Sequence, residues 1–232
     1  MRQAESVRSI VAALANALIA VTLAPRCAAC DSPLDEPIAG CVCTSCWADI
    51  PRTGTVRWTS SWITTARAGG DFDGRLRQII HAFKYDRRRS LAAPLAAFMS
   101  CTAADVLLGA DCVVPVPLHP VRGIRRGFNQ AGDLASRLDL PVVHALWRTR
   151  RTSPQSGLTA AARRHNVRNA FTMSPLWTSR RGDRLLRNRT VVLVDDVRTT
   201  GETLNACARV LLERAGAREV RAVTAAAREL GT

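Results

Sequence analysis

The stretch VVLVDDVRTTGET, residues 191–203, decides the fold class of this chain. It opens with four aliphatic residues, which is typical of a central parallel strand covered on both faces. Two carboxylates, Asp195 and Asp196, end the apolar run, and a turn rich in Thr and Gly follows them. Apolar residues at helical spacing come next, and a second strand begins at EVRAVTAAA, residues 219–227. We therefore expect a βαβ unit and an α/β fold around a central, mostly parallel sheet.

The helix of this unit has a clear buried side and a clear end. The segment AGA at 215–217 ends it. The apolar residues on its core side are Leu204, Val210, Leu211 and Leu212. In open sheets of this class, ligands bind beyond the carboxyl ends of the strands. Asp195 and Asp196 fall at that end, so the sequence predicts a ligand site around them.

The turn between strand and helix has the composition of an anion-binding cradle. From Arg198 to Thr203 it offers successive backbone N–H groups at a helix start, three Thr hydroxyls, and Gly201 for close approach. Two carboxylates beside a phosphate would repel it unless they hold hydroxyls or a metal ion. Ribose offers two neighbouring hydroxyls, and Mg²⁺ can link them to a diphosphate. A sugar phosphate that carries a diphosphate fits these features together, whereas N-capping acids on an ordinary helix are the alternative.

Positive charge is concentrated in the middle of the chain. The 232 residues carry a formal net charge of +14, and Lys84 is the only lysine. The segment 118–190 holds fifteen Arg against three Asp, which accounts for +12 of that charge. Such a basic field favours an anionic partner, either the phosphates of a small molecule or a nucleic acid. A solvated, Arg-rich surface is the alternative.

The N-terminus carries a short apolar segment, residues 10–23, behind Arg2 and Arg8. This arrangement is typical of a secretory signal, but Glu5 lies in the basic region, and Arg26 before Cys27 disfavours lipoprotein processing. Fourteen apolar residues are too few for a comfortable membrane span. We therefore expect an Ala-rich helix packed on the domain, no stable membrane span and a cytoplasmic protein.

Five of the eight cysteines lie between residues 27 and 46. Four of them form two C-x2-C pairs separated by twelve residues, a spacing typical of a tetrahedral zinc site. The four candidate ligands are Cys27, Cys30, Cys43 and Cys46. A closed site of four thiolates leaves no position for substrate, so we expect a structural Zn²⁺ in a small zinc ribbon. Disulfides in an exported protein are the competing interpretation.

The remaining cysteines carry weaker signals. Cys41 is a surplus thiol that could replace Cys43 as a ligand, although C-x2-C geometry favours Cys43. Cys101, Cys112 and Cys207 have apolar neighbours in sequence, and we expect them to pack as small hydrophobic side chains.

The middle of the chain supplies further cationic groups. Apolar spacing predicts a helix over 76–83 that ends at Lys84, and another helix over 91–99. A lysine at a helix C-terminus is either a favourable partner of the helix dipole or a mobile phosphate contact. The segment 148–171 is a long polar stretch that then becomes basic and helical, and such a loop is usually functional or disordered.

A loop with several arginines follows a short buried strand, 112–116. Arg122, Arg125 and Arg126 lie on this loop, where exposed backbone and guanidinium groups suit a pyrophosphate. A solvated basic loop is the alternative. Asn129 is expected to cap the helix that follows.

The stretch at 191–203 resembles the signature with which type I phosphoribosyltransferases bind 5-phosphoribosyl-1-pyrophosphate (PRPP). The wider chain, roughly residues 25–230, is similar to the ComF family of competence-associated, predicted phosphoribosyltransferases. Three further features carry this resemblance: the C-x2-C pairs, PVPLHPVRGIRRGFNQA at 115–131, and RTSPQSGLTAAARRHNVRNAF at 151–171. The resemblance implies a type I phosphoribosyltransferase-like fold with a small N-terminal zinc ribbon.

The resemblance also implies roles for single residues. Asp195 and Asp196 would hold the 2′- and 3′-hydroxyls of ribose, and the loop 198–203 would enclose the 5′-phosphate. The PRPP-binding set implied in this way is Asp195, Asp196, Arg198, Thr199, Thr200, Gly201, Glu202, Thr203, Arg122 and Arg126. The last two would belong to a pyrophosphate loop. The implied catalytic set is Arg151, Thr152, Gln155 and Arg163 on a loop that closes over PRPP, together with Lys84.

The reaction implied for this class is displacement of pyrophosphate from the anomeric carbon by a nitrogen nucleophile. Mg²⁺ and arginine groups would stabilise the departing diphosphate in an oxocarbenium-like transition state. No covalent nucleophile is needed, in agreement with a sequence that shows no recognisable Ser/His/Asp or Cys/His arrangement. Thr199 stands where purine-using relatives commonly carry Asp, which resembles the orotate type and leaves the acceptor open.

A second class of function stays open beside the enzyme. It is a non-enzymatic, ComF-like accessory protein in DNA uptake or competence, with the zinc ribbon and the arginines binding single-stranded DNA. PRPP and an unknown acceptor are the expected partners; single-stranded DNA, the competence machinery and a homodimer are open alternatives. The expected domains are an N-terminal helix at 1–24, the zinc ribbon at 25–50, a connector at 51–70 and a phosphoribosyltransferase-like domain at 71–232.

Overall fold

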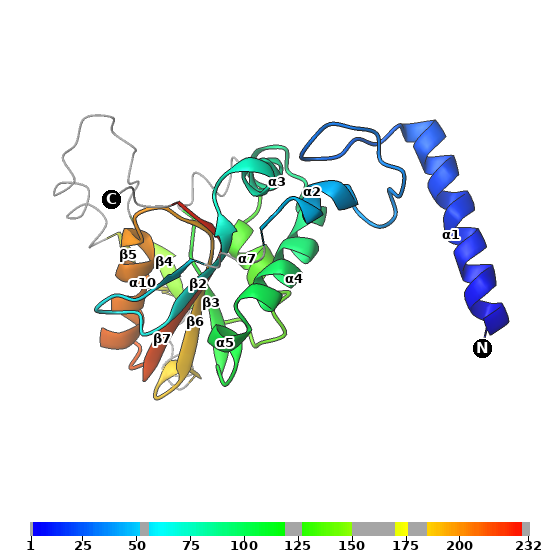
Figure 1. The fold of residues 1–232 in the computed structure, drawn as a ribbon. Helices are drawn as coiled ribbons and strands as arrows, with labels where there is room; N and C mark the ends of the chain where they lie inside the picture. The colour runs from blue at the N-terminus through cyan, green and yellow to red at the C-terminus, as the bar shows by residue number, and fades with distance from the viewer. Residues whose placement is uncertain (1, 52–55, 119–126, 150–169, 176–184, 229–232) are drawn as a thin grey trace, which may run out of the picture. The chain divides into compact units, whose positions relative to one another are not determined.

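The computed structural model describes residues 2–51, 56–118, 127–149, 170–175 and 185–228 (Figure 1). The chain divides into two compact units, residues 1–51 with 73–91, and residues 52–72 with 92–232. Each unit is described below by itself. The boundaries expected from the sequence stay a prediction.

The second unit is built on a five-stranded sheet in the order β1-β2-β7-β6-β3. Its strands are β1 (Arg57–Trp58), β2 (Ala66–Asp71), β7 (Glu219–Ala227), β6 (Thr190–Arg198) and β3 (Cys112–Pro115). The pairs β2–β7, β7–β6 and β6–β3 are parallel, and β1 joins the edge antiparallel to β2. The α/β fold with a mostly parallel sheet, expected from the sequence, is confirmed.

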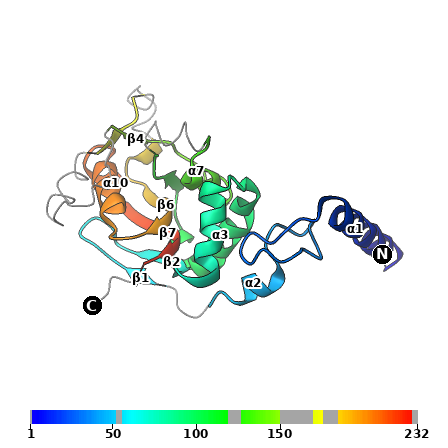
Figure 2. The same cartoon turned by 90° about the horizontal axis from the view of Figure 1, so that it is seen from above.

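Helices cover both faces of this sheet, which explains why β6 is continuously apolar. Val191 and Leu193 belong to the core cluster that also contains Leu204 and Leu211 of α10 (Glu202–Glu213). Two helices, α4 (Ala92–Thr102) and α7 (Gln130–Ala135), contact each other and the opposite face. Figure 2 shows α10 and α7 on opposite sides of β6 and β7.

The approach of α4 to the sheet depends on small residues. A Cβ placed on Gly69 of β2 would overlap the ring of Phe98 and would lie 2.8 Å from the carbonyl oxygen of Ala225. Only glycine leaves room for that ring, and the last residues of β7, Ala225 to Ala227, are small and buried as well. The remaining elements of this unit are α5 (Ala104–Leu107) and a two-stranded antiparallel sheet of β4 (Leu146–Arg148) and β5 (Phe171–Met173).

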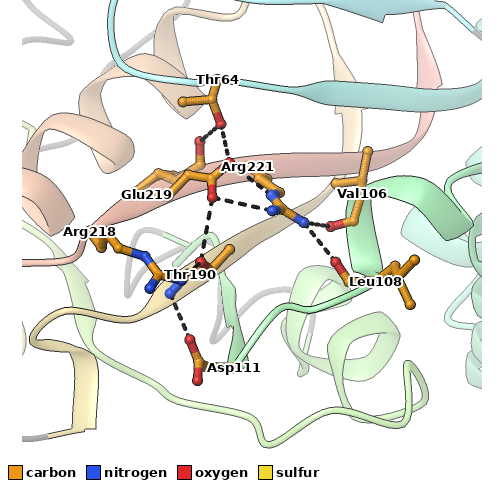
Figure 3. A network of polar contacts seen from close by, with 9 residues as sticks. Thr64, Val106, Leu108, Asp111, Thr190, Arg218, Glu219 and Arg221 are labelled. Carbon is orange, nitrogen blue, oxygen red and sulfur yellow. Dashed lines mark hydrogen bonds and ion pairs between the residues drawn. The ribbon is translucent and has the colours of Figure 1, made fainter.

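A polar network fastens the starts of the parallel strands, at the edge opposite Asp195 (Figure 3). The guanidinium of Arg221 donates to both carboxylate oxygens of Glu219, at 2.9 and 3.2 Å, and to the carbonyl oxygens of Val106 and Leu108. Asp111 accepts a 2.8 Å hydrogen bond from the Thr190 amide. These bonds satisfy polar groups that strand starts would otherwise leave unpaired.

The network also lowers two carboxyl pKa values. The amide of Thr190 holds the pKa of Asp111 below its ordinary value of 3.8. Hydrogen bonds from Arg221 lower the pKa of Glu219, and a 2.7 Å hydrogen bond donated by the hydroxyl of Thr64 lowers it further. Both carboxylates are therefore bound more tightly as anions in the folded chain than in the unfolded chain.

The first unit contains α1 (Arg2–Leu23), the cysteine segment with α2 (Thr44–Ala48), α3 (Gly74–Tyr85) and the short 3-10 turn η1 (Arg89–Leu91). The buried side of α3 includes Leu76, Ile79 and Phe83, as its spacing predicts, and Lys84 lies in its last turn. No helix in the part of the chain that the structure describes is long and apolar enough to cross a bilayer.

Some expectations about single elements are wrong. The N-terminal helix exists, but its side chains from Val11 to Leu23 are exposed or half-buried, so this part is not packed on a domain. The Ile38 amide donates a 3.0 Å hydrogen bond to Asn16 Oδ1 of this helix. Cys101 is exposed, because it falls on the outer side of α4, while Cys112 and Cys207 are buried as expected.

Two further helix residues, Asn129 and Leu212, also differ from expectation. Asn129 stands at the N-cap position of α7, but its side chain makes no capping bond there. Its Nδ2 instead donates to the carbonyl oxygen of Val116, at 3.2 Å, which ties the helix start to the end of β3. Leu212 is only partly buried against the core.

Candidate functional site

The carboxyl ends of the parallel strands bring the expected ligand-binding residues to one edge. Asp195 pairs with Thr224, and Arg198 with Ala227, so β6 continues four residues past the apolar run at 191–194. The sequence places the acidic pair at the end of the strand, and pairing with β7 carries β6 on through the pair to Arg198. The carboxyl edge is therefore formed by Asp71 of β2, Ala227 of β7 and the 195–198 segment.

The two carboxylates of the pair face different sides of the sheet. Successive side chains of a strand point to opposite faces of the sheet. Asp195 therefore lies on the same face as Val191 and Leu193, and Asp196 lies on the opposite face. Asp196 is buried, with 9% of its surface exposed, and its amide donates to Asp195 Oδ1 at 2.9 Å. Asp195 also helps burial to raise the pKa of the Cys207 thiol on α10. A ligand at the strand end can thus be held from both sides of one backbone.

The turn after β6 leaves backbone donors open. Gly201 is the N-cap residue of α10, at φ +80° and ψ −6°, and it offers no side chain to cap the helix. The first N–H groups of a helix have no partner within it, so the amides of Glu202 and Thr203 are available to an anion. Thr199 and Thr200 are exposed beside them. These are the groups from which the sequence predicts an anion cradle, and the binding of an anion there stays a prediction.

Arg198 is held in place by residues that the sequence did not point to. Its guanidinium carbon lies 4.7 Å from the ring centroid of Trp58, and its carbonyl accepts a 2.9 Å hydrogen bond from the Arg228 amide. Arg228 itself lies over the ring of Phe72, at 5.5 Å. Burial lowers the pKa of Arg198, and its Nε is buried without a hydrogen-bond partner among the described residues. Nothing in the spacing of Trp58, Phe72 and Arg228 could have indicated that they meet here.

Several expected site residues lie outside the described residues. These are Arg122, Arg125 and Arg126 of the pyrophosphate loop, and Arg151, Thr152, Gln155 and Arg163 of the closing loop. Lys84 lies in the last turn of α3, in the first unit. The roles of these residues stay predictions.

The four expected metal ligands come together in the first unit. Sγ atoms of Cys27, Cys30, Cys43 and Cys46 all lie within 4.8 Å of one another. The distance is 3.9 Å between Cys27 and Cys46, and 3.8 Å between Cys30 and Cys43. A tetrahedral zinc with Zn–S bonds of about 2.3 Å requires sulfur atoms about 3.8 Å apart. The cluster therefore fits zinc, and all four cysteines are free of disulfides.

Local hydrogen bonds prepare two of these thiols to be anions. The hydroxyl and the amide of Ser32 lower the pKa of Cys30 to about 6. The Ser45 hydroxyl, 3.1 Å from Cys43 Sγ, lowers the pKa of Cys43. Cys46 is different, since burial raises the pKa of its thiol. The surplus Cys41 lies outside the cluster, with its Sγ 3.4 Å from Ser90 Oγ, so Cys43 and not Cys41 completes the set.

Comparison with known proteins identifies the family. The model of the phosphoribosyl transferase domain matches residues 124–232. Competence protein F of Haemophilus influenzae is 33% identical over 161 residues, which cover 65% of this chain and 67% of that protein. The chain belongs to the ComF family. This membership gives the second unit a phosphoribosyltransferase-type fold, as the sequence resemblance implied.

Other ComF-family relatives extend the match. The DNA utilization protein YhgH of Escherichia coli K12 is 33% identical over 158 residues, which cover 63% of this chain and 65% of the relative. Competence protein ComFC of Bacillus subtilis is 27% identical over 208 residues, or 85% of this chain and 82% of the relative. The chain spans about two thirds of the length of the first relatives that it matches.

One solved structure is similar to part of this ComF-family chain. The allosteric regulatory enzyme of purine biosynthesis is 21% identical, with a TM-score of 0.37, over 59% of this chain and 26% of that chain.

Proposed function

We propose that this ComF-family protein binds PRPP at the carboxyl edge of the sheet and transfers its phosphoribosyl group to a nitrogen acceptor. One observation carries the proposal: a single stretch of backbone, 195–203, presents two carboxylates, three hydroxyls and open amide N–H groups at a strand-to-helix turn. The match to the phosphoribosyl transferase domain includes this stretch.

Each group has a distinct task in the proposed complex. Asp195 and Asp196 accept hydrogen bonds from the two ribose hydroxyls, one from each side of the strand end. The amides of Glu202 and Thr203 donate to the 5′-phosphate, and the threonine hydroxyls add further donors. Gly201 lets the phosphate approach the backbone closely. Binding at both ends of the sugar fixes the anomeric carbon between them.

The proposed reaction needs no covalent intermediate with the protein. The bond between C1′ and the pyrophosphate oxygen breaks, and its electron pair leaves with pyrophosphate. The acceptor nitrogen forms a bond to C1′ and releases its proton to water. Mg²⁺, when bound with PRPP, would neutralise charge that develops on the departing pyrophosphate. Carboxylates are the hard oxygen groups that Mg²⁺ sites in proteins use, so the acidic pair is compatible with it.

Calorimetric titration with PRPP and Mg²⁺ tests the binding step. We expect the unaltered chain to bind, and Asp195→Asn and Asp196→Asn to lose at least tenfold in affinity, about 1.4 kcal/mol each. Asp139→Asn is the matched control, because Asp139 is an exposed carboxylate that also adopts a positive φ of 52°, which Asn tolerates. Equal affinity in all four proteins would refute the proposed site.

A second candidate is a non-enzymatic accessory role in DNA uptake. It is favoured by the names of the relatives, which are competence and DNA utilization proteins. In this role the phosphoribosyltransferase-type fold would bind PRPP without transfer, and the basic segments would bind single-stranded DNA. Release of pyrophosphate from PRPP across a panel of nitrogen bases distinguishes the two. Release with one base supports the enzyme; no release, with salt-sensitive DNA binding, supports the accessory role.

We also propose that the cysteine cluster holds a structural Zn²⁺ and that the protein works in the cytoplasm. The sulfur distances support the first part. The second part rests on the free cysteines, because free thiols persist in reducing compartments. The homodimer stays a prediction.

A further inference from the structure

The second unit has a cleft of about 390 Å³ on the flank of α10. Within the described chain it is lined by the segment 60–62 on one wall, and by Glu202, Asn205, Arg209 and Glu213 of α10 on the other. The acidic pair and the Thr residues of the phosphate loop do not line it. Its volume lies within the range of about 300–1,000 Å³ that small-molecule sites occupy.

The helix presents charged groups of both signs to this cleft. Positions 202, 205, 209 and 213 are spaced by three, four and four residues, so they share one face of α10. Two carboxylates stand near the two ends, eleven residues or about 16 Å apart along the helix axis. Arg209 stands between them and closer to Glu213. In a chain with a net charge of +14, this lining has one more negative group than positive groups.

The opposite wall consists of Ser60, Ser61 and Trp62, and hydrogen bonds hold it in place. The ring of Trp62 lines the cleft, and the indole face attracts cations. The amide of Trp62 donates to Ser60 Oγ at 3.2 Å, and the hydroxyl of Ser60 donates to Asn205 Oδ1 at 2.6 Å. The bond between Ser60 and Asn205 joins the two walls, so the cleft exists before any ligand binds.

We propose that this cleft binds a dibasic amino acid, or a small molecule that carries the same groups. Two cationic groups and one carboxylate match the two carboxylates and the guanidinium of the lining. An aliphatic stem packs on the face of Trp62, and one cationic group gains from the ring as well as from a carboxylate.

The cleft is connected to the phosphate loop through both of its walls. Glu202 directly follows Gly201, and the amide of Asn205 donates to the Gly201 carbonyl at 2.9 Å. On the other wall, the segment that contains Ser60 begins beside Trp58, which stacks on Arg198. A ligand bound between these walls therefore contacts the segments that position the loop, and we expect it to change the affinity of the loop for PRPP. This second step, unlike the binding of the amino acid, rests on the proposed function.

Binding is tested by calorimetry with L-arginine and no PRPP. We expect binding, a loss of about tenfold with citrulline, which lacks the guanidinium charge, and a smaller loss with agmatine, which lacks the carboxylate. Glu213→Gln should weaken arginine binding about tenfold and Trp62→Leu about fivefold. Glu36→Gln, an exposed acid of the first unit, is the control. Absence of arginine binding, or equal binding to Glu213→Gln and Glu36→Gln, would overturn the proposal.

The coupling is tested by repeating the PRPP titration with the cleft saturated by arginine. We expect the Kd for PRPP to change at least fivefold, and not to change in Glu213→Gln. An unchanged Kd in the unaltered chain overturns the coupling. If PRPP does not bind at all, the proposed function fails, while arginine binding in the first experiment still decides the cleft.

Discussion

The guanidinium of Arg198 lies over the ring of Trp58, 4.7 Å from its centroid, and this contact joins the edge strand β1 to the end of β6. The side chain of Arg198 is half-buried, and this burial lowers its pKa. Cation–π attraction strengthens when the cation is desolvated. The contact therefore fixes the residue with which the proposed phosphate loop begins.

Replacing Trp58 tests how much that contact contributes to the loop. Trp58→Ala should weaken PRPP binding by about 1 kcal/mol, the loss of one partly desolvated cation–π contact, or roughly fivefold in Kd. Trp58→Phe should keep most of the affinity, since a ring face remains. Calorimetry with PRPP and Mg²⁺ measures both variants. Equal losses in the two would mean that packing, and not the ring face, positions Arg198.

Gly201 should be intolerant of any side chain because of its backbone conformation. At φ +80°, alanine is strained by about 1–2 kcal/mol, and its Cβ would lie 3.5 Å from Arg198 Nε. Gly201→Ala should lower the free energy of unfolding by that amount and weaken PRPP binding. Urea denaturation and calorimetry measure the two effects.

Gly132 is the matched control for Gly201. It lies inside α7, where a Cβ would make an ordinary contact of 3.6 Å with Asn129. Gly132→Ala should therefore be neutral or stabilise the fold by about 0.5–1 kcal/mol. Destabilisation by both variants to the same extent would contradict the argument from the positive φ.

Metal analysis of purified protein tests the cysteine cluster. We expect one zinc per chain, lost on treatment with a strong chelator at about the rate at which the first unit unfolds. Cys43→Ser should lose the metal, because it removes one of four ligands. Cys41→Ser should keep it, because Cys41 lies outside the cluster. Retention in Cys43→Ser together with loss in Cys41→Ser would reverse the assignment of the fourth ligand.

Acid should destabilise the second unit through the network at the strand starts. The pKa values of Asp111 and Glu219 are lowered in the folded chain, from 3.8 and 4.5. Their stabilising contribution is complete above these unfolded values and is lost as the pH falls through the lower, folded ones. The free energy of unfolding should therefore fall below about pH 4.5.

Urea denaturation between pH 6 and pH 3 measures this dependence. Glu219→Gln should be less stable than the unaltered chain at pH 6 by about 1–3 kcal/mol, the value of hydrogen bonds to a charged group. Its stability should also fall less steeply with acid. Glu36→Gln, outside the network, should keep the original slope. A slope that Glu219→Gln leaves unaltered would assign the acid dependence to other carboxylates.

Local patterns in the sequence were sufficient to predict several structural features of this protein. The apolar run 191–194 predicts a central parallel strand, because only a strand covered on both faces is continuously aliphatic. The twelve-residue spacing of the C-x2-C pairs predicts the sulfur cluster, because each pair forms one tight turn. The open N–H groups after Gly201 also follow from local composition. Each of these inferences concerns residues that are close in sequence.

Other features depend on contacts between distant segments. Pairing with β7 extends β6 to Arg198. The residues of β6 alone do not determine the register of this pairing, because the register depends on the partner strand. The sequence predicts that both Cys101 and Cys112 pack as small hydrophobic side chains, yet only Cys112 is buried, because burial depends on which side of α4 or β3 meets the core. The exposed surface of α1 could not be read from its apolar composition for the same reason.

The sequence by itself determined the class of fold, the four thiols and the groups in the 195–203 loop. The tertiary structure alone decided that Trp58 of the edge strand β1, three positions from β6 in the sheet order, stacks on Arg198. It also decided that the segment 60–62 and one face of α10 enclose a cleft. The physical reason is the distance in sequence between the residues that interact. Turns and strand patterns depend on neighbouring residues. Stacking contacts and clefts form only when long loops close and distant surfaces pack.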